Sequence, residues 1–175
     1  MLIKLSLQSC CRKDWHVFTG NEIGSLLGYW QMLIYTTKFE MDKSDLVFVN
    51  SAISSKMLRS MARKEQMVFE ETLTGFKWMA NRAQRFERDD GKTVLLCYEE
   101  AIGFMCGTRV LDKDGVFAAV RMAELLAFLE RQGKTLLQQL DELYDRNGSF
   151  MFYILISGCP KVRANSNHPL NFVKG

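Results

Sequence analysis

Two adjacent carboxylates, Glu99 and Glu100, follow a mostly apolar run over residues 93–98. Such a run is typical of a buried strand, and α/β proteins bind ligands beyond the carboxyl ends of parallel strands. Carboxylates at that position can accept hydrogen bonds from neighbouring hydroxyl groups of a sugar ring. Adjacent glutamates can also lie on a solvated loop, and the spacing by itself favours this second interpretation.

Lys113 lies between two aspartates, immediately before a predicted helix. A lysine beside free backbone N–H groups can bind phosphate, but it can equally be a solvated side chain beside two capping acids. The pattern Asp112-x-Asp114-Gly115 also resembles the start of a calcium loop. The remaining ligand positions and the closing glutamate are missing, so we reject a calcium site.

Composition excludes several other classes of function. The net charge is +3, hydrophobic residues make up 47% and charged residues 25%, and no basic stripe predicts a nucleic-acid partner. No apolar run is long enough to cross a bilayer, so no membrane partner is expected. The cysteines form no CxxC pair, and only two histidines are present, so no metal site is predicted and the thiols are expected to be reduced in the cytoplasm. The five cysteines are at positions 10, 11, 97, 106 and 159.

Strand and helix patterns alternate along the chain. Short apolar runs at 46–50, 67–69 and 93–98 predict strands, and amphipathic segments between and after them predict helices. The helices are expected to begin after Thr19, at Ser54 or Ser55, after Gly75, at Asp114-Gly115 and at Thr135, where Gln138 completes a capping box. This alternation predicts a three-layer α/β/α fold with a mainly parallel sheet. A polar stretch at 36–45 predicts a domain boundary.

Four motifs in order give a resemblance to a known family. They are VFTGNEIG at 17–24, EETLTGFKW at 70–78, YEEAIG at 98–103 and VLDKDGV at 110–116. Together they resemble the α-D-phosphohexomutases, and within them the phosphoglucomutase 2-like branch of phosphopentomutase and glucose 1,6-bisphosphate synthase. The resemblance implies that 15–45 is the helical end of domain II and 46–148 is the sugar-binding domain III. Residues 1–14 and 149–175 do not resemble the family.

The resemblance also implies roles for individual residues. Thr74 and Gly75 match the turn that touches the bisphosphorylated sugar, and Glu99 matches the carboxylate that reads two ring hydroxyls. Lys113 matches a basic residue that faces the sugar or its phosphate. Ala101 stands where many relatives have serine. Losing that hydroxyl removes about 0.5–1.5 kcal/mol of hydrogen bonding and is consistent with a preference for pentoses.

The family's phosphoryl-transfer parts do not match any segment of this sequence. These parts are a phosphorylated serine, an Asp-x-Asp-x-Asp loop that holds Mg²⁺, and a loop that grips the non-transferring phosphate, with glucose 1,6-bisphosphate as activator. The sequence therefore predicts no catalytic residue and no metal ligand here. We expect a fragment of a phosphoglucomutase- or phosphopentomutase-type isomerase that is inactive alone and binds a sugar phosphate. The alternative is a non-catalytic sugar-phosphate-binding or interaction module produced by truncation.

Overall fold

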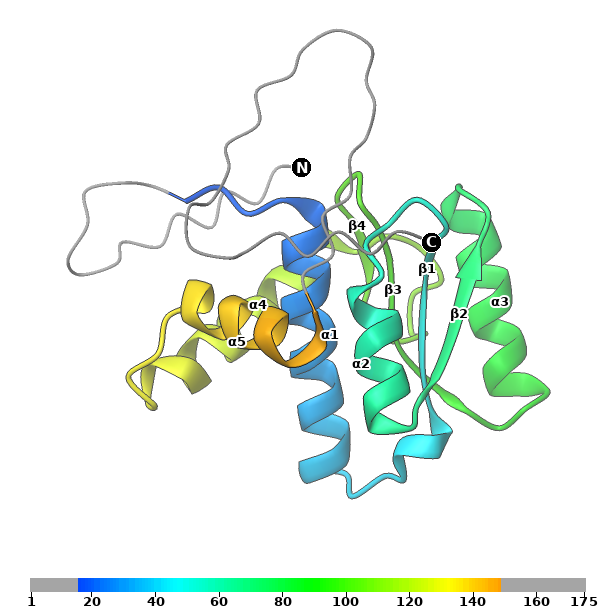
Figure 1. Cartoon of the computed structure of the whole chain (residues 1–175). Helices are drawn as coiled ribbons and strands as arrows, with labels where there is room; N and C mark the ends of the chain where they lie inside the picture. Colours follow the sequence, from blue (N-terminus) through cyan, green and yellow to red (C-terminus); the bar gives the residue numbers. More distant parts are fainter. Residues whose placement is uncertain (1–15, 149–175) are drawn as a thin grey trace, which may run out of the picture.

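The central sheet has four strands in the order β2-β1-β3-β4 (Figure 1). It is seen in a computed structural model that describes residues 16–148, so the predicted segments 1–14 and 149–175 lie outside the described residues. Strand β1 pairs in parallel with both β2 and β3, and β4 pairs antiparallel with β3. The mainly parallel α/β sheet predicted from the sequence is confirmed. The strands are β1 Leu46–Ser51, β2 Val68–Thr72, β3 Thr93–Glu99 and β4 Gly103–Met105.

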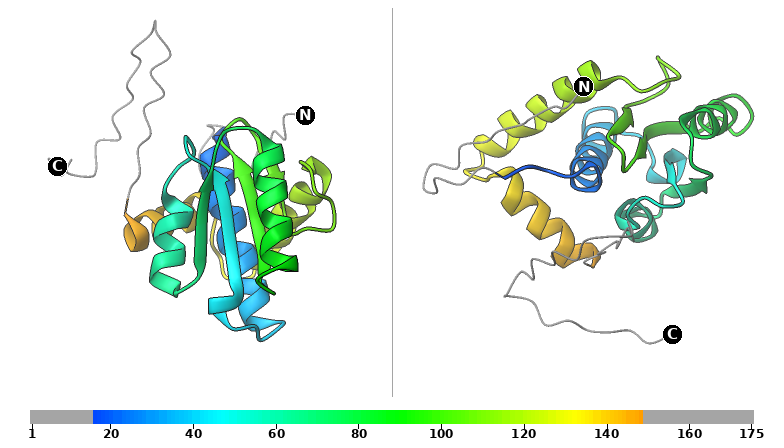
Figure 2. Two further views of the ribbon diagram at one scale, coloured as in Figure 1. Left: turned by 90° about the vertical axis from the view of Figure 1, so that its right-hand side faces the viewer. Right: turned by 90° about the horizontal axis from the view of Figure 1, so that it is seen from above.

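Helices cover both faces of this sheet. Helix α3 lies on one face, while α1 and α2 lie on the other (Figure 1). Helices α4 and α5 pack against α1, and α4 also contacts β4 at the edge of the sheet (Figure 2). The helices are α1 Gly20–Thr37, α2 Met57–Glu65, α3 Phe76–Arg88, α4 Gly115–Glu130 and α5 Leu136–Asn147, with a short 3-10 turn, η1, at Lys43–Asp45.

Alternation along β1 divides the core into two parts. Leu46 and Phe48 pack on the side of α1 and α2, whereas Val47 and Val49 pack on the side of α3. All four side chains are fully buried. A strand that is apolar on both faces fits the middle of a covered parallel sheet, which explains why the strand was recognisable from the sequence.

A register shift interrupts the pairing of β1 with β3 next to Leu95. The carbonyl oxygen of Leu95 accepts a hydrogen bond from the buried Gln31 Nε2 at 3.1 Å and another from the Gly107 amide at 3.1 Å. Both donors lie outside the pairing of β1 with β3. A helix α1 side chain therefore satisfies a backbone group at the irregularity, which ties α1 to the middle of the sheet.

The first helix belongs to the same core as the sheet. Its start is the predicted one, because Thr19 and Glu22 form a capping box. Its buried residues Leu26 and Leu27 lie in one cluster with Phe48 of β1. The boundary predicted at 36–45 separates α1 from the sheet, whereas the structure packs the two together. The assignment of 15–45 to domain II remains a prediction.

The start of α2 differs from the sequence-based expectation. Lys56 is the N-cap residue and its side chain makes no capping hydrogen bond. Ser55 lies one residue earlier, and its Oγ accepts from the Met57 amide at 3.2 Å. The Ser54 hydroxyl instead donates to Glu100 at 3.0 Å. Of the two serines predicted to begin the helix, Ser54 thus binds a tertiary partner, while Ser55 accepts from the first helical amide.

Removing the cap of α5 is expected to have a modest effect on stability. The Thr135 Oγ accepts from the Gln138 amide, and the Gln138 side chain accepts from the Thr135 amide at 2.8 Å. Thr135→Ala should lower the free energy of unfolding by about 1 kcal/mol, because one amide of the first turn loses its acceptor. Urea unfolding measures the change. Thr135→Ser keeps the hydroxyl and should stay close to the unmodified chain, and equal losses in the two variants would contradict the capping role.

Candidate functional site

The loops that follow β1, β2 and β3 lie along one edge of the sheet, beside the start of α1 (Figure 1). This edge is formed by the carboxyl ends of the three parallel strands. The strand-end rule applied to the sequence points to this edge. The arrangement places residues from distant parts of the chain next to one another, as in other α/β ligand sites.

Glu99 is the centre of this group. Its Oε1 accepts a hydrogen bond from the Gly75 amide at 2.9 Å, and its Oε2 lies 3.7 Å from the Lys113 Nζ. The Glu99 side chain is only 14% exposed, whereas that of Lys113 is 50% exposed. Segments that follow β2 and β4 therefore meet the Glu99 carboxylate at the end of β3, and the Lys113 ammonium beside it is open to solvent.

Lys113 reaches Glu99 across a glycine. A Cβ added at Gly103 would lie 3.0 Å from Lys113 Cγ and would overlap its Cδ, so the lysine stem lies directly over this backbone position. The ammonium group is also 5.6 Å from the centre of the Phe76 ring, within the range of a cation–π contact. The backbone amide of Lys113 donates to Asp112 Oδ1 at 2.7 Å, and Asp114 caps α4 by accepting from the Phe117 amide at 2.9 Å.

The remaining two predicted site residues are exposed at the same edge. Thr74 precedes Gly75 in the loop before α3, and Ala101 lies in the turn between β3 and β4. Gly75 has a φ of 112°, a conformation that favours glycine and that directs its amide toward Glu99. The structure thus brings Gly75, Glu99 and Lys113 into contact, with Thr74 and Ala101 on the adjoining loop positions.

Glu100 has different surroundings from Glu99. Its Oε2 accepts hydrogen bonds from the hydroxyls of Ser51 and Ser54, each at 3.0 Å. Both serines belong to the end of β1 and the loop that follows it, and both are buried. The sequence presents the two glutamates as one pair, gives Ser51 no role and offers Ser54 only as a candidate helix cap. The signal that could separate them is the alternation of side chains along a strand, which sends neighbours to opposite faces.

A second polar cluster joins α1 to this edge. Asn21 Oδ1 accepts from the Ser55 amide at 2.9 Å and from the Tyr98 hydroxyl at 3.2 Å. Burial of the Tyr98 ring raises the pKa of its phenol well above the ordinary value, which keeps the hydroxyl a donor. The cluster explains part of the 17–24 motif, because Asn21 holds the loop after β1 instead of facing solvent.

The described part of the chain contains neither a metal-binding cluster nor a membrane-spanning helix. Within residues 16–148 no group of three or more His, Cys, Asp or Glu side chains could hold a metal ion. These residues therefore do not fit the Mg²⁺ that the family resemblance implies. No helix in the same range is long and apolar enough to span a membrane.

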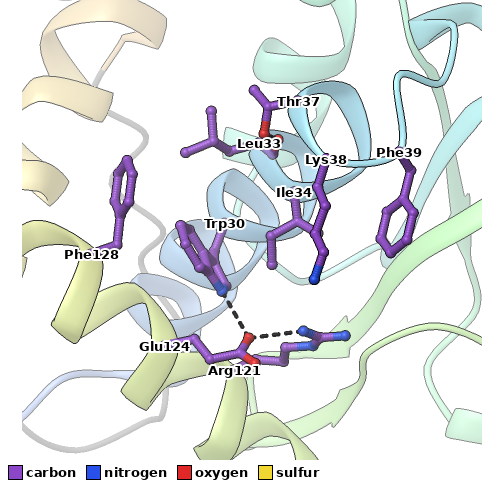
Figure 3. A pocket seen from close by; sticks show the side chains of 9 residues that line it. All are labelled: Trp30, Leu33, Ile34, Thr37, Lys38, Phe39, Arg121, Glu124 and Phe128. Carbon is purple, nitrogen blue, oxygen red and sulfur yellow. Dashed lines mark hydrogen bonds and ion pairs between the residues drawn. The ribbon is translucent and has the colours of Figure 1, made fainter.

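A pocket of about 570 Å³ lies between the second half of α1 and α4 (Figure 3). Aromatic rings of Trp30, Phe39 and Phe128 line it, and Trp30 Nε1 donates to Glu124 Oε2 at 3.3 Å. The same oxygen accepts from Arg121 Nη1 at 2.8 Å. None of the sequence-predicted site residues lines this pocket, so it is separate from the strand-end group.

The chain is similar to one family and to several of its characterised members. A family model described as "Phosphoglucomutase/phosphomannomutase, alpha/beta/alpha domain III" matches residues 20–147. A phosphopentomutase of Mus musculus is 53% identical over 138 residues, which are 77% of this chain and 22% of that protein. A glucose 1,6-bisphosphate synthase of Mus musculus is 41% identical over 162 residues, covering 90% of this chain and 26% of that protein. The chain thus spans roughly a quarter of the length of these curated relatives.

A solved structure agrees with the fold. The crystal structure of a protein described as a "putative phosphomannomutase" from Thermus thermophilus superposes with a TM-score of 0.59 at 18% identity, covering 75% of this chain and 26% of that one. At this identity the likeness concerns the fold alone. It supports the α/β architecture seen here.

Proposed function

Because this chain belongs to the phosphoglucomutase/phosphomannomutase family through its domain III, we propose that it forms the sugar-reading part of a phosphomutase that acts on a sugar phosphate. The observation that carries the proposal is the Glu99 carboxylate, held by the Gly75 amide and beside the Lys113 ammonium at the strand ends. Phosphopentomutase- or phosphoglucomutase-type isomerisation by the whole protein is part of the same proposal.

The held carboxylate retains the acceptor capacity that a sugar needs. An ionised carboxylate has about four acceptor positions, and one position of Glu99 is filled by the Gly75 amide. The remaining positions can accept two vicinal hydroxyls of a sugar ring. Because the backbone already fixes the carboxylate, little side-chain freedom is lost when a sugar binds.

The cation next to Glu99 suits the phosphate of the same ligand. The Lys113 ammonium is half exposed and lies over the Phe76 ring as well as beside Glu99. A phosphate oxygen can approach it from solvent, and the exposed Thr74 hydroxyl stands on the neighbouring loop as a further donor. The group thus offers acceptors for hydroxyls and donors for phosphate, which is the combination that a sugar phosphate requires.

Ala101 bears on which sugar is preferred. Its methyl group is exposed in the turn after Glu99, at the position where the family resemblance implies a serine in many relatives. A missing hydroxyl weakens binding of a sugar that would have used it by about 0.5–1.5 kcal/mol. We propose that the site favours a pentose phosphate over a hexose phosphate, in keeping with the similarity to phosphopentomutase.

The residues described here bind and orient but do not supply the transfer step. Phosphoryl transfer depends on positioning and on neutralising the moving charge, usually with Mg²⁺. Residues 16–148 hold no cluster that could bind the metal. The proposed role of these residues is therefore recognition of the sugar phosphate.

Binding of a sugar phosphate to the 175-residue chain tests the proposal. Titration with ribose 1-phosphate, followed by NMR, should give a dissociation constant of about 1 mM, or roughly −4 kcal/mol. Glu99→Ala removes charge-assisted hydrogen bonds to the hydroxyls and should weaken binding at least about tenfold. Glucose 1-phosphate should bind more weakly than ribose 1-phosphate.

The matched control for Glu99→Ala removes a carboxylate that lies far from the strand-end group. Glu65 ends α2 and pairs with Lys43 at 2.6 Å, just before β1 begins, so it lies at the opposite edge of the sheet. Glu65→Ala should leave the dissociation constant unchanged. If Glu99→Ala bound as well as Glu65→Ala, the strand-end group would not be the sugar site.

A further inference from the structure

Two neighbouring glutamates at the end of β3 serve different parts of the structure. Glu99 faces Gly75 and Lys113 on the side of α3. Glu100 faces Ser51 and Ser54, at the end of β1 and in the loop that follows. The proposed sugar recognition uses only the first of them. The second is partly buried and has no assigned role, although its partners are more completely buried than those of Glu99.

The two serines depend on Glu100 for a charged acceptor. Both side chains are buried, with Ser51 and Ser54 at 0% relative exposure, and their Oγ atoms are 2.7 Å apart. Each hydroxyl lies 3.0 Å from Glu100 Oε2. Buried hydroxyls without partners are costly, so the loop after β1 and the Glu100 carboxylate hold each other in one arrangement.

The backbone of Glu100 is held at the same point. Its amide donates to Ser54 Oγ at 3.2 Å. Its carbonyl group packs against Gly20 at the start of α1, where an added Cβ would overlap the oxygen and lie 2.9 Å from the carbonyl carbon. The next residues turn sharply, and Ile102 has a φ of 64°. Glu100 therefore connects the turn after β3 both to the loop after β1 and to α1.

We propose that Glu100 is a positioning residue: by anchoring the turn to Ser51 and Ser54, it holds the preceding Glu99 carboxylate against the Gly75 amide. The effect on sugar binding rests on the proposed function. The effect on Glu99 itself exists without any ligand. Glu100 does not contact the sugar, because its carboxylate is directed to the serines on the other side of the strand.

Hydrogen exchange of the Gly75 amide in the unliganded 175-residue chain reports this positioning. Gly75 is exposed, and its amide donates to Glu99, so the bond to Glu99 accounts for its protection. Glu100→Ala should speed Gly75 exchange about tenfold, approaching the rate in Glu99→Ala. The Ala83 amide, in the interior of α3, should not change. Unchanged Gly75 exchange in Glu100→Ala, or an unprotected Gly75 in the original chain, would overturn the proposal.

A conservative change of Glu100 and a change of its partner Ser54 distinguish a positioning role from a general loss of structure. Glu100→Gln keeps an oxygen that can accept from both serines and should restore Gly75 protection to within about threefold. Ser54→Ala removes one donor and leaves Glu100 in place. If the two residues act together, the effects of Ser54→Ala and Glu100→Ala on Gly75 exchange should not be additive in the double variant. Full additivity would contradict the link between them.

Titration with ribose 1-phosphate distinguishes this proposal from the proposed function. Glu100→Ala should weaken binding about threefold to tenfold while Glu65→Ala has no effect. If the original chain binds no sugar phosphate but Gly75 exchange responds to Glu100, sugar recognition fails and positioning stands. If the chain binds sugar phosphate and Glu100→Ala binds it equally well, positioning by Glu100 is overturned and sugar recognition stands.

Discussion

Raising the pH from 8 to 10.5 is expected to lower the free energy of unfolding of this chain by about 5 kcal/mol, mainly through two buried thiols. Burial raises the pKa of Cys97, in the middle of β3, far above its ordinary value. Burial also raises the pKa of Cys106 to about 12, although the charge of Arg121 acts in the other direction. Both side chains are free thiols.

The direction of the effect follows from where the protons are lost. In the unfolded chain a thiol loses its proton near pH 8.5, whereas the folded chain keeps both protons to much higher pH. The contribution of the two thiols to the free energy of unfolding is therefore fully present below about pH 8.5. It is lost as the pH rises toward the pKa values of the folded chain. Each thiol therefore contributes roughly half of the expected loss. Tyr98 and Tyr144, whose pKa values burial also raises, add to the loss above about pH 10.

Urea unfolding at pH 8 and at pH 10.5 measures this loss. The double variant Cys97→Ala, Cys106→Ala is less stable at pH 8 because buried volume is removed. Its stability should nevertheless fall with pH much less steeply than that of the original chain. An equally steep fall in both proteins would show that other groups cause the alkaline instability.

Gly20→Ala is expected to destabilise the chain by about 3 kcal/mol, at the upper end of the usual cost of overpacking. A Cβ at this position would overlap the Glu100 carbonyl oxygen and lie 3.2 Å from the Ile102 amide nitrogen. The obstructing atoms belong to the backbone of the turn after β3, so no side chain can move aside. Thermal unfolding should show the loss, and the Gly75 amide should also lose protection as the turn shifts.

Gly115→Ala is the matched control for that substitution. Gly115 is the first residue of α4, as Gly20 is of α1, and an added Cβ there meets nothing within 4 Å. Alanine is a better helix former than glycine by up to about 1 kcal/mol, so Gly115→Ala should be neutral or slightly stabilising. A similar loss in both variants would mean that helix starts in this chain require glycine for another reason.

The central strands and all five α-helices were predictable from the sequence because their patterns are local. β1 and β3 are continuous apolar runs, and Thr19 and Thr135 begin helices with capping boxes. β4 was not predicted, because three residues are too few to show a periodic pattern. The register shift at Leu95 was also missed, since it depends on the contact with Gln31 from another element.

The candidate site was predictable in part for a similar reason. The rule that ligands bind beyond parallel strand ends, together with the family resemblance, selected Gly75, Glu99 and Lys113, and the structure brings them into contact. The partners of Glu100 could not be predicted from spacing, because Ser51 and Ser54 lie almost fifty residues earlier in the sequence. The packing of α1 against the sheet depends on tertiary contacts and could not be predicted either. The polar stretch at 36–45 instead suggested a domain boundary between them.

The two edge strands of the sheet affect whether molecules of this protein associate by strand pairing. β2 pairs on one side only and carries Glu70 and Glu71, which form ion pairs with Arg82 at 2.6 Å and Lys56 at 2.8 Å. A strand from a second molecule would have to approach these charges, and a copy of β2 would bring like charges together. At the other margin β4 offers only three residues. Within the described residues, charge at one margin and shortness at the other discourage growth of the sheet from molecule to molecule.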